Sequence, residues 1–175
     1  KVTEIKITLY RVARNSNVVN SLINAIRNGK RVTVVVELQA RFDEENNIYW
    51  ANKLTEEGAT VIYGVPRLKV HSKLFLITLR KNGKETKIAH IGTGNFNENT
   101  AKIYTDFSLL TADKRITDEA KEYMYSGKNG PITKEFVLTY GTPNENGQYG
   151  VREVVRAQTK SAEIVDKELN QSLEC

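Results

Sequence analysis

Hydrophobic and polar positions follow strand and helix periods in turn along the first third of the chain. Residues 4–10 alternate apolar and polar side chains, residues 31–38 form a β-branched run, and residues 60–63 predict a third strand. Between these strands, two stretches carry apolar residues at helical spacing. One begins after an N-cap at Asn15 or Ser16 and ends at Gly29, and the other runs from Asp43 to Gly58. This β-α-β-α-β order predicts a parallel sheet with helical crossovers.

The middle of the chain predicts antiparallel strands. Residues 73–80 and 86–91 flank Lys81-Asn82-Gly83-Lys84, in which Asn-Gly is a hairpin signal. A glycine-rich loop, a strand and a helix capped by Thr117 are expected to follow, over residues 92–97, 104–111 and 117–125. The fold class expected is therefore α/β, with a mixed sheet flanked by helices.

Residues 126–131 (SGKNGP) indicate a boundary. We expect a catalytic domain over residues 1–125. Residues 126–175 would form a linker and an amphipathic C-terminal helix of uncertain role. Within that tail, a strand, a loop and one long helix are expected over residues 134–140, 142–150 and 151–173.

Composition narrows the class of protein. The 175 residues suit one domain, and 39% hydrophobic with 27% charged residues is ordinary for a globular protein. The single cysteine, Cys175, excludes a disulfide framework and a structural zinc site, which fits a reducing cytoplasm. No apolar run is long enough to cross a bilayer. The first residues contain neither an initiator Met nor a signal peptide, so we read them as the cut edge of a longer protein.

The net charge of +5 favours polyanionic partners. Nucleic acid, nucleotides, phosphate chains and anionic membranes all satisfy it, and the charge alone does not choose among them.

His71 is the strongest candidate for chemistry. On a strand, residues two apart share a face, so His71 and Lys73 are expected to point the same way. An ammonium beside an imidazole disfavours the charged imidazolium, and a neutral imidazole has the lone pair that a nucleophile needs. Lys73 would also hold an incoming phosphate. A surface histidine on a basic strand would give the same short pattern.

The loop after the second hairpin strand is a candidate phosphate site. Its glycines, in Gly92-Thr93-Gly94-Asn95, let the main chain approach a ligand closely. Thr93, Asn95 and main-chain N–H groups would then donate to phosphate oxygens. A plain turn after a strand is the alternative.

Arginines follow the first two strands. Arg11 ends the first strand and Arg41 follows the second, where ligands of open α/β sheets gather. Arginine binds phosphate oxygens in a bidentate manner. An arginine at one such place is more often a solvated charge, but two arginines at equivalent strand ends favour a phosphate site.

Other polar residues carry weaker signals. Asp106 would orient His71 by accepting its other ring proton, or would be a capping or surface residue. Tyr104, on the same face of the expected strand, would stack on a base, contact a phosphate or simply pack. His90, between Ala89 and Ile91 in a strand, is expected to be structural.

Five blocks of sequence, in order, resemble bacterial polyphosphate kinase over about residues 1–120. They are residues 9–13 (LYRVA), 35–44 (VVELQARFDE), 68–73 (LKVHSK), 90–97 (HIGTGNFN) and 104–113 (YTDFSLLTAD). The tail from about Glu122 shows no such resemblance. The family has the phospholipase D fold, so the resemblance implies a phospholipase-D-like mixed sheet.

The resemblance implies reversible transfer of the ATP γ-phosphate to inorganic polyphosphate through a phosphohistidine at His71. By position, Arg11 and Arg41 resemble arginines that handle phosphate together with Mg²⁺, without ligating the metal themselves. Tyr104 resembles a nucleotide-contacting tyrosine, and Asp106 resembles the acid beside the histidine. Lys73 and Asn95 match the H-x-K…G-x-G-x-N frame of the wider superfamily.

The chain departs from the family in two ways. The superfamily's usual Asp five residues after the Lys is Thr78 here, which argues against phosphodiesterase chemistry. A second H-x-K is absent from the sequence, so the parent chain or a second copy would supply it. A homo-oligomer and peripheral attachment to a membrane are compatible with this interpretation, and no specific nucleic acid is expected. The alternatives are a homodimeric phospholipase-D-like nuclease or phosphodiesterase, and a non-catalytic polyphosphate-binding fragment.

Overall fold

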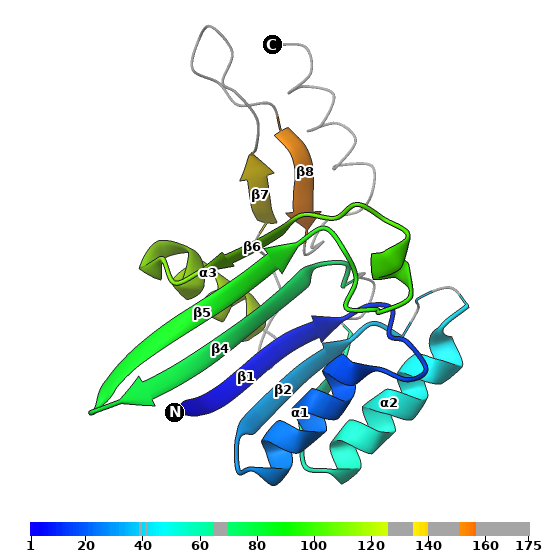
Figure 1. The fold of residues 1–175 in the computed structure, drawn as a ribbon, viewed down its shortest axis with the longest axis horizontal. Helices are drawn as coiled ribbons and strands as arrows, with labels where there is room; N and C mark the ends of the chain where they lie inside the picture. The colour runs from blue at the N-terminus through cyan, green and yellow to red at the C-terminus, as the bar shows by residue number, and fades with distance from the viewer. Residues whose placement is uncertain (39, 41, 65–69, 126–134, 140–150, 157–175) are drawn as a thin grey trace, which may run out of the picture.

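The computed structural model describes residues 1–38, 40, 42–64, 70–125, 135–139 and 151–156 (Figure 1). Its main feature is a six-stranded sheet in the order β3-β2-β1-β4-β5-β6. The strands are β1 (Val2–Leu9), β2 (Arg31–Val36), β3 (Thr60–Tyr63), β4 (Lys73–Lys81), β5 (Lys84–Gly92) and β6 (Ser108–Thr111). The pairs β1–β2 and β2–β3 are parallel, while β1–β4, β4–β5 and β5–β6 are antiparallel. The mixed sheet expected from the sequence is confirmed.

Two helices cover one face of the parallel half of the sheet. Helices α1 (Asn17–Arg27) and α2 (Glu44–Glu56) lie in front of the sheet in Figure 1, and α3 (Lys114–Tyr125) lies behind β4 and β5. The core between the first two helices and the sheet is apolar, and its members are Ile7, Leu9, Val12, Val19, Leu22, Ile23, Val32, Val34, Val36, Trp50, Ala51 and Leu54. The alternation of residues along β1 therefore turns one apolar row towards α1 and α2.

The expected ends of the elements are present. The Ser16 hydroxyl accepts the Val19 N–H at 3.2 Å and caps α1, and Gly29 ends that helix with a φ of 72°. Asn82 and Gly83, with φ values of 50° and 77°, form the two-residue turn between β4 and β5.

Chain direction determines where the site forms. Because β4 is antiparallel to β1, its first residues meet the end of β1, as the pairing of Phe75 with Ile7 shows. The segment that contains His71 thus reaches the same edge of the sheet as the carboxyl ends of β1 and β2. The hairpin turn lies at the opposite end of β4 (Figure 1).

Two boundaries expected around residues 104–125 are wrong. The strand begins at Ser108, so Tyr104 and Asp106 precede it and do not share a strand face. Helix α3 begins at Lys114, because the Asp113 carboxylate accepts the Arg115 N–H at 2.9 Å and caps the helix there. Thr117 lies inside the helix, and its hydroxyl donates to the Lys114 carbonyl.

The tail also differs from expectation. Residues 151–156, expected to begin a long helix, form strand β8 (Val151–Arg156), which pairs antiparallel with β7 (Glu135–Thr139). Valine at three of six positions suits a strand, and this β-propensity outweighs the seven-residue apolar spacing. The rest of the expected helix, residues 157–173, lies outside the described residues. Among the helices that are described, none combines the length and the apolar character needed to span a membrane.

Candidate active site around His71

The candidate site lies where β1 ends and β4 begins. The His71 side chain is exposed, and its ring meets the Tyr10 ring edge-on, with centroids 4.7 Å apart and planes at 76°. Tyr10 directly follows β1 and is 9% exposed. A buried aromatic ring thus supports one side of an accessible imidazole.

Lys73 brings a buried positive charge to the imidazole. Its Nζ lies 3.0 Å from Nδ1 and 3.1 Å from Nε2 of His71, although Lys73 is only 5% exposed. The same Nζ lies 5.5 Å from the centre of the Tyr10 ring. His71 precedes β4, yet the expected closeness of His71 and Lys73 is found.

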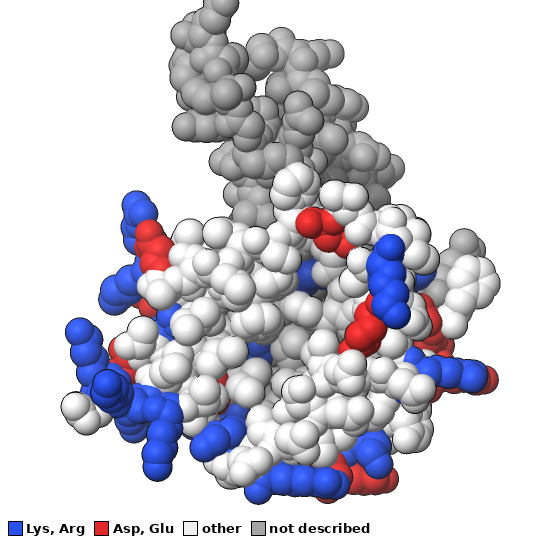
Figure 2. Space-filling view, viewed as in Figure 1, with Lys and Arg blue, Asp and Glu red and all other residues white. Residues whose placement is uncertain are grey.

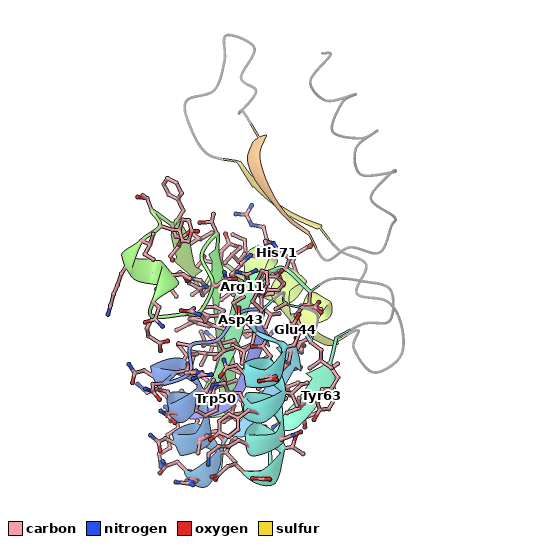
Figure 3. All side chains as sticks on the ribbon, turned by 90° about the vertical axis from the view of Figure 1, so that its right-hand side faces the viewer. Arg11, Asp43, Glu44, Trp50, Tyr63 and His71 are labelled. Atoms are coloured by element: carbon pink, nitrogen blue, oxygen red, sulfur yellow. The ribbon has the colours of Figure 1, made fainter. Side chains whose placement is uncertain are left out.

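Arg11 contributes a second cation at the same edge. Its guanidinium carbon is 5.8 Å from the centre of the Tyr10 ring, and its Nε is 3.6 Å from Asp43 Oδ2. Asp43 precedes α2, but its carboxylate makes no capping hydrogen bond to that helix. Figure 3 shows His71, Arg11 and Asp43 together at the upper end of the sheet. Arg41, the other predicted arginine, lies outside the described residues.

The glycine-rich loop is tied to the segment before β6. The Thr93 hydroxyl donates to Asp106 Oδ1 at 2.9 Å and accepts the Phe107 N–H at 3.0 Å. The Thr93 N–H donates to the Phe107 carbonyl at 3.1 Å. Asp106 therefore holds the loop through Thr93. A hydrogen bond from the His71 ring N–H to the Asp106 carboxylate stays a prediction.

Gly94 leaves room for Asp106. A Cβ on Gly94 would lie 2.5 Å from Asp106 Cγ and 2.9 Å from its Cβ, with Oδ2 nearer still. We expect Gly94→Ala to displace the Asp106 carboxylate from Thr93. Where His71 takes up phosphate, as the sequence resemblance implies, that uptake should slow by about 10-fold or more, as small misplacements in active sites do. Uptake of phosphate from γ-labelled ATP measures this effect.

The origin of that loss can be checked with a double variant. If the Asp106 clash causes it, Gly94→Ala combined with Asp106→Gly, which also removes the Asp106 Cβ, is no slower than Asp106→Gly alone. Gly29→Asn is the matched control, because Gly29 has nothing within 4 Å of an added Cβ and Asn tolerates a positive φ. A Gly94→Ala protein with unchanged uptake would contradict the prediction.

Asn95 and Tyr104 stay predictions as ligand-binding residues. The Asn95 Oδ1 atom is buried and has no hydrogen-bond partner in the part of the chain that the structure describes. Tyr104 is 66% exposed, and its N–H donates to the Thr100 carbonyl just beyond a short 3-10 turn, η1 (Thr100–Lys102). Its ring is accessible to a ligand.

His90 packs into the structure, as expected. It is 8% exposed, its ring stacks on Phe75 at 4.9 Å between centroids, and its Nε2 lies 3.1 Å from Ser108 Oγ. Burial lowers the pKa of His90 below its ordinary value of 6.5, although a main-chain hydrogen bond at Lys73 opposes this shift.

This burial predicts acid sensitivity of the fold. Below pH 6.5 the unfolded chain protonates His90 more readily than the folded chain does, so the free energy of unfolding falls as the pH drops. Urea unfolding at about pH 7 and about pH 5 is expected to show this loss, and a smaller loss in His90→Gln. Equal slopes in both proteins would contradict it.

Sequence reasoning missed three residues that build the site. Tyr10 supports the imidazole, the buried Glu37 contacts the chain beside His71, and Asn47 Nδ2 donates to the Tyr10 carbonyl at 2.7 Å and to the Glu37 carbonyl at 2.9 Å. A charged residue directly after a run of valines was a visible signal for Glu37.

The charged side chains, and the side chains that could ligate a metal ion, limit which ligands the edge of the sheet at His71 can bind. Lysine and arginine side chains on the face in Figure 2 lie mainly towards its rim, with acidic side chains among them, and most of the middle of this face is uncharged. Within the described residues, no group of three or more His, Cys, Asp or Glu side chains is placed to hold a metal ion. The arrangement offers a nucleophile with adjacent cations, which suits a phosphate group.

Comparison with known proteins supports the same reading. The profile of the polyphosphate kinase C-terminal domain 1 family matches residues 1–127. The chain is 52% identical to polyphosphate kinase of Escherichia coli (strain K12) over 161 residues, which are 90% of this chain and 23% of that protein. It is 63% identical to polyphosphate kinase of Vibrio vulnificus (strain YJ016) over 121 residues, or 69% of this chain and 17% of that protein.

A solved structure extends the likeness to three dimensions. The crystal structure of polyphosphate kinase from Porphyromonas gingivalis matches with a TM-score of 0.63 and 39% identity, over 78% of this chain and 24% of that one. The phospholipase-D-like α/β fold class is thereby confirmed. The chain spans about a quarter or less of the length of these relatives.

The extent of the Escherichia coli match corrects one expectation. Because it covers 90% of the chain, it continues past Glu122, where the sequence was expected to stop resembling the family. With the sheet, the His71 edge and these matches in agreement, the chain belongs to the polyphosphate kinase C-terminal domain 1 family.

Proposed function

We propose that this chain is the part of a polyphosphate kinase in which His71 accepts the γ-phosphate of ATP and passes it to inorganic polyphosphate. One observation carries the proposal: an exposed imidazole lies within 3.1 Å of a buried lysine ammonium at the end of β1. The ammonium favours a neutral ring and attracts a phosphate, and both effects serve a nucleophile that attacks phosphorus.

The reaction has two reversible displacements. In the first, a His71 ring nitrogen forms a bond to the γ-phosphorus, the bond from phosphorus to the bridging oxygen breaks, and ADP leaves with the electron pair. In the second, a terminal oxygen of polyphosphate bonds to the same phosphorus and the P–N bond breaks. The proton on the other ring nitrogen stays on the ring in both steps. Asp106 is the residue proposed to accept its hydrogen bond.

The cations would offset charge on the transferred group. Lys73 and Arg11 lie beside the same Tyr10 ring as His71, so a phosphoryl group on the imidazole would be within reach of both. Arg41 is proposed to join them. Thr93, Asn95 and Tyr104 are proposed to contact the phosphates and the nucleotide.

Magnesium is proposed to enter with the substrate. The described residues do not gather enough ligands for a resident ion, and Arg11 is a cation that cannot ligate one. Mg²⁺ commonly binds through substrate phosphates, so we assign it to the Mg²⁺–ATP complex.

The remaining parts of the site are proposed to come from elsewhere. The chain spans only 23% of its Escherichia coli relative, and it contains one H-x-K. A longer polypeptide, or a second copy in a homo-oligomer, would supply the second H-x-K and help to hold the nucleotide. A cytoplasmic location, with peripheral membrane association as an option, completes the proposal.

The test is phosphate transfer from ATP. The full-length protein that carries this chain is incubated with Mg²⁺ and with ATP labelled at the γ- or the α-phosphate. Only the γ-label is expected on the protein, in an acid-labile, base-stable form, and it should chase into polyphosphate. Phosphodiester cleavage without ATP would favour the phosphodiesterase alternative, and polyphosphate binding without label would favour a non-catalytic fragment.

A further inference from the structure

The main chain on both sides of His71 is held by buried side chains from other parts of the sheet. The Val70 N–H donates to Glu37 Oε2 at 2.6 Å. On the other side, the Ser72 carbonyl accepts the Thr8 hydroxyl at 2.6 Å, and the Leu74 N–H donates to that hydroxyl at 3.1 Å. His71 itself lies outside β4, so these bonds to its neighbours decide where its exposed ring stands.

Glu37 is itself fixed in place. It follows β2 directly and is 3% exposed. Its N–H donates to the Leu9 carbonyl at 2.9 Å, and its carbonyl accepts Asn47 Nδ2 at 2.9 Å. Because its own main chain is held by β1 and α2, Glu37 has a fixed position from which its carboxylate can hold the main chain at Val70.

The choice of a carboxylate at this place needs a reason beyond packing. Taking a charged group out of water is costly, and glutamine could accept the same Val70 N–H without that cost. A carboxylate forms shorter and stronger hydrogen bonds to N–H groups than a neutral acceptor does. The 2.6 Å contact fits such a charge-assisted bond.

We propose that Glu37 is a positioning residue for His71. Its buried carboxylate fixes the main chain at Val70, which keeps the His71 ring against Tyr10 and beside Lys73 while the phosphoryl group arrives and leaves. Glu37 makes no contact with substrate in this scheme. Its effect on phosphoryl transfer rests on the proposed function, while its effect on the Val70 amide does not.

The test compares Glu37→Ala with Glu37→Gln in the full-length protein. Glu37→Ala is expected to slow His71 labelling at saturating ATP by about 100-fold, because a displacement of about 1 Å can cost that much. The ATP concentration for half-maximal rate should change by less than about 3-fold, since no substrate contact is lost. Glu37→Gln keeps an acceptor and should stay within about 10-fold of wild type.

Hydrogen–deuterium exchange gives a readout that needs no activity. Exchange of the peptide that contains Val70 should be faster in Glu37→Ala than in wild type, and close to wild type in Glu37→Gln. Val34→Ala, a fully buried core change on β2, is the matched control for lost stability. It should lower the melting temperature while leaving the labelling rate, measured well below melting, within about 2-fold of wild type.

The outcomes show whether Glu37 positions His71 or has another role. Labelling by Glu37→Ala at the wild-type rate overturns the proposal. If Glu37→Ala does not fold, Glu37→Gln decides: normal exchange with nearly normal labelling supports positioning, and normal exchange with lost labelling overturns it. If wild-type protein takes up no label, the proposed function is wrong. In that case hydrogen–deuterium exchange of the peptide that contains Val70 is the remaining test of Glu37. Unchanged exchange in Glu37→Ala would overturn the positioning role.

Discussion

Replacing His71 with alanine is expected to abolish the acid-labile, base-stable phosphate that the proposed function predicts on wild-type protein after incubation with γ-labelled ATP. The loss should reach at least about 10⁴-fold, as it does when a nucleophile is deleted from other enzymes. The reason is chemical. A ring nitrogen of the exposed His71 imidazole, beside Lys73, is the atom proposed to bond to phosphorus, and the alanine side chain has no lone pair to replace it. Polyphosphate synthesis should fall with the label.

A surface change provides the control for this result. Asn20→Ala, on the exposed side of α1, should label at the wild-type rate. Because the His71 side chain is itself exposed, His71→Ala should also melt within a few degrees of wild type. Label retained in His71→Ala would show that another residue carries the phosphate.

Replacing Lys73 with methionine is expected to give the second-largest loss. Methionine fills a similar volume without the charge, so phosphate uptake should slow by about 10²–10³-fold, the range seen when one preorganised donor is removed from a transition state. Stability should be kept, because Lys73 is 5% exposed and a buried ammonium costs solvation energy. Labelling rates and thermal melts measure the two effects.

Lys87 offers a matched lysine for comparison. It lies on β5, is largely buried and pairs with Asp118 of α3 at 2.7 Å, away from His71. Lys87→Met should therefore label normally. Equal losses in the two methionine variants would mean that Lys73 acts through stability and not through the phosphoryl group.

The sequence predicts most of the sheet because its signals there are local. The β-branched run of β2, the Asn82-Gly83 turn and the Ser16 cap each determine a short segment from its own residues. Residues 104–107 were misread because Tyr104 and Phe107 resemble strand residues, whereas Thr93 holds Phe107 by hydrogen bonds outside the β6 ladder. Such long-range bonds have no local sequence pattern.

The candidate site could be predicted only in part for the same reason. His71 and Lys73 are two residues apart, so the assumption of a strand predicted that they lie together, although His71 precedes β4. Tyr10, Glu37 and Asn47 reach the site from three other segments, and only the sheet order reveals that β4 begins where β1 ends. Asp106 was assigned to His71 from its residue type. The hydrogen bond that the structure gives its carboxylate is to Thr93, which no local sequence pattern indicates, and the bond to His71 stays a prediction.

The Asn82-Gly83 turn has a practical consequence. Residues 81–86 are exposed at the far tip of the β4–β5 hairpin, a full strand length from Lys73. A fluorophore or an affinity tag inserted at this tip would move with the sheet, yet it would stay clear of the ATP that the opposite edge is proposed to receive. The hairpin is thus a built-in site for a label that would follow this domain inside the longer protein proposed to contain it.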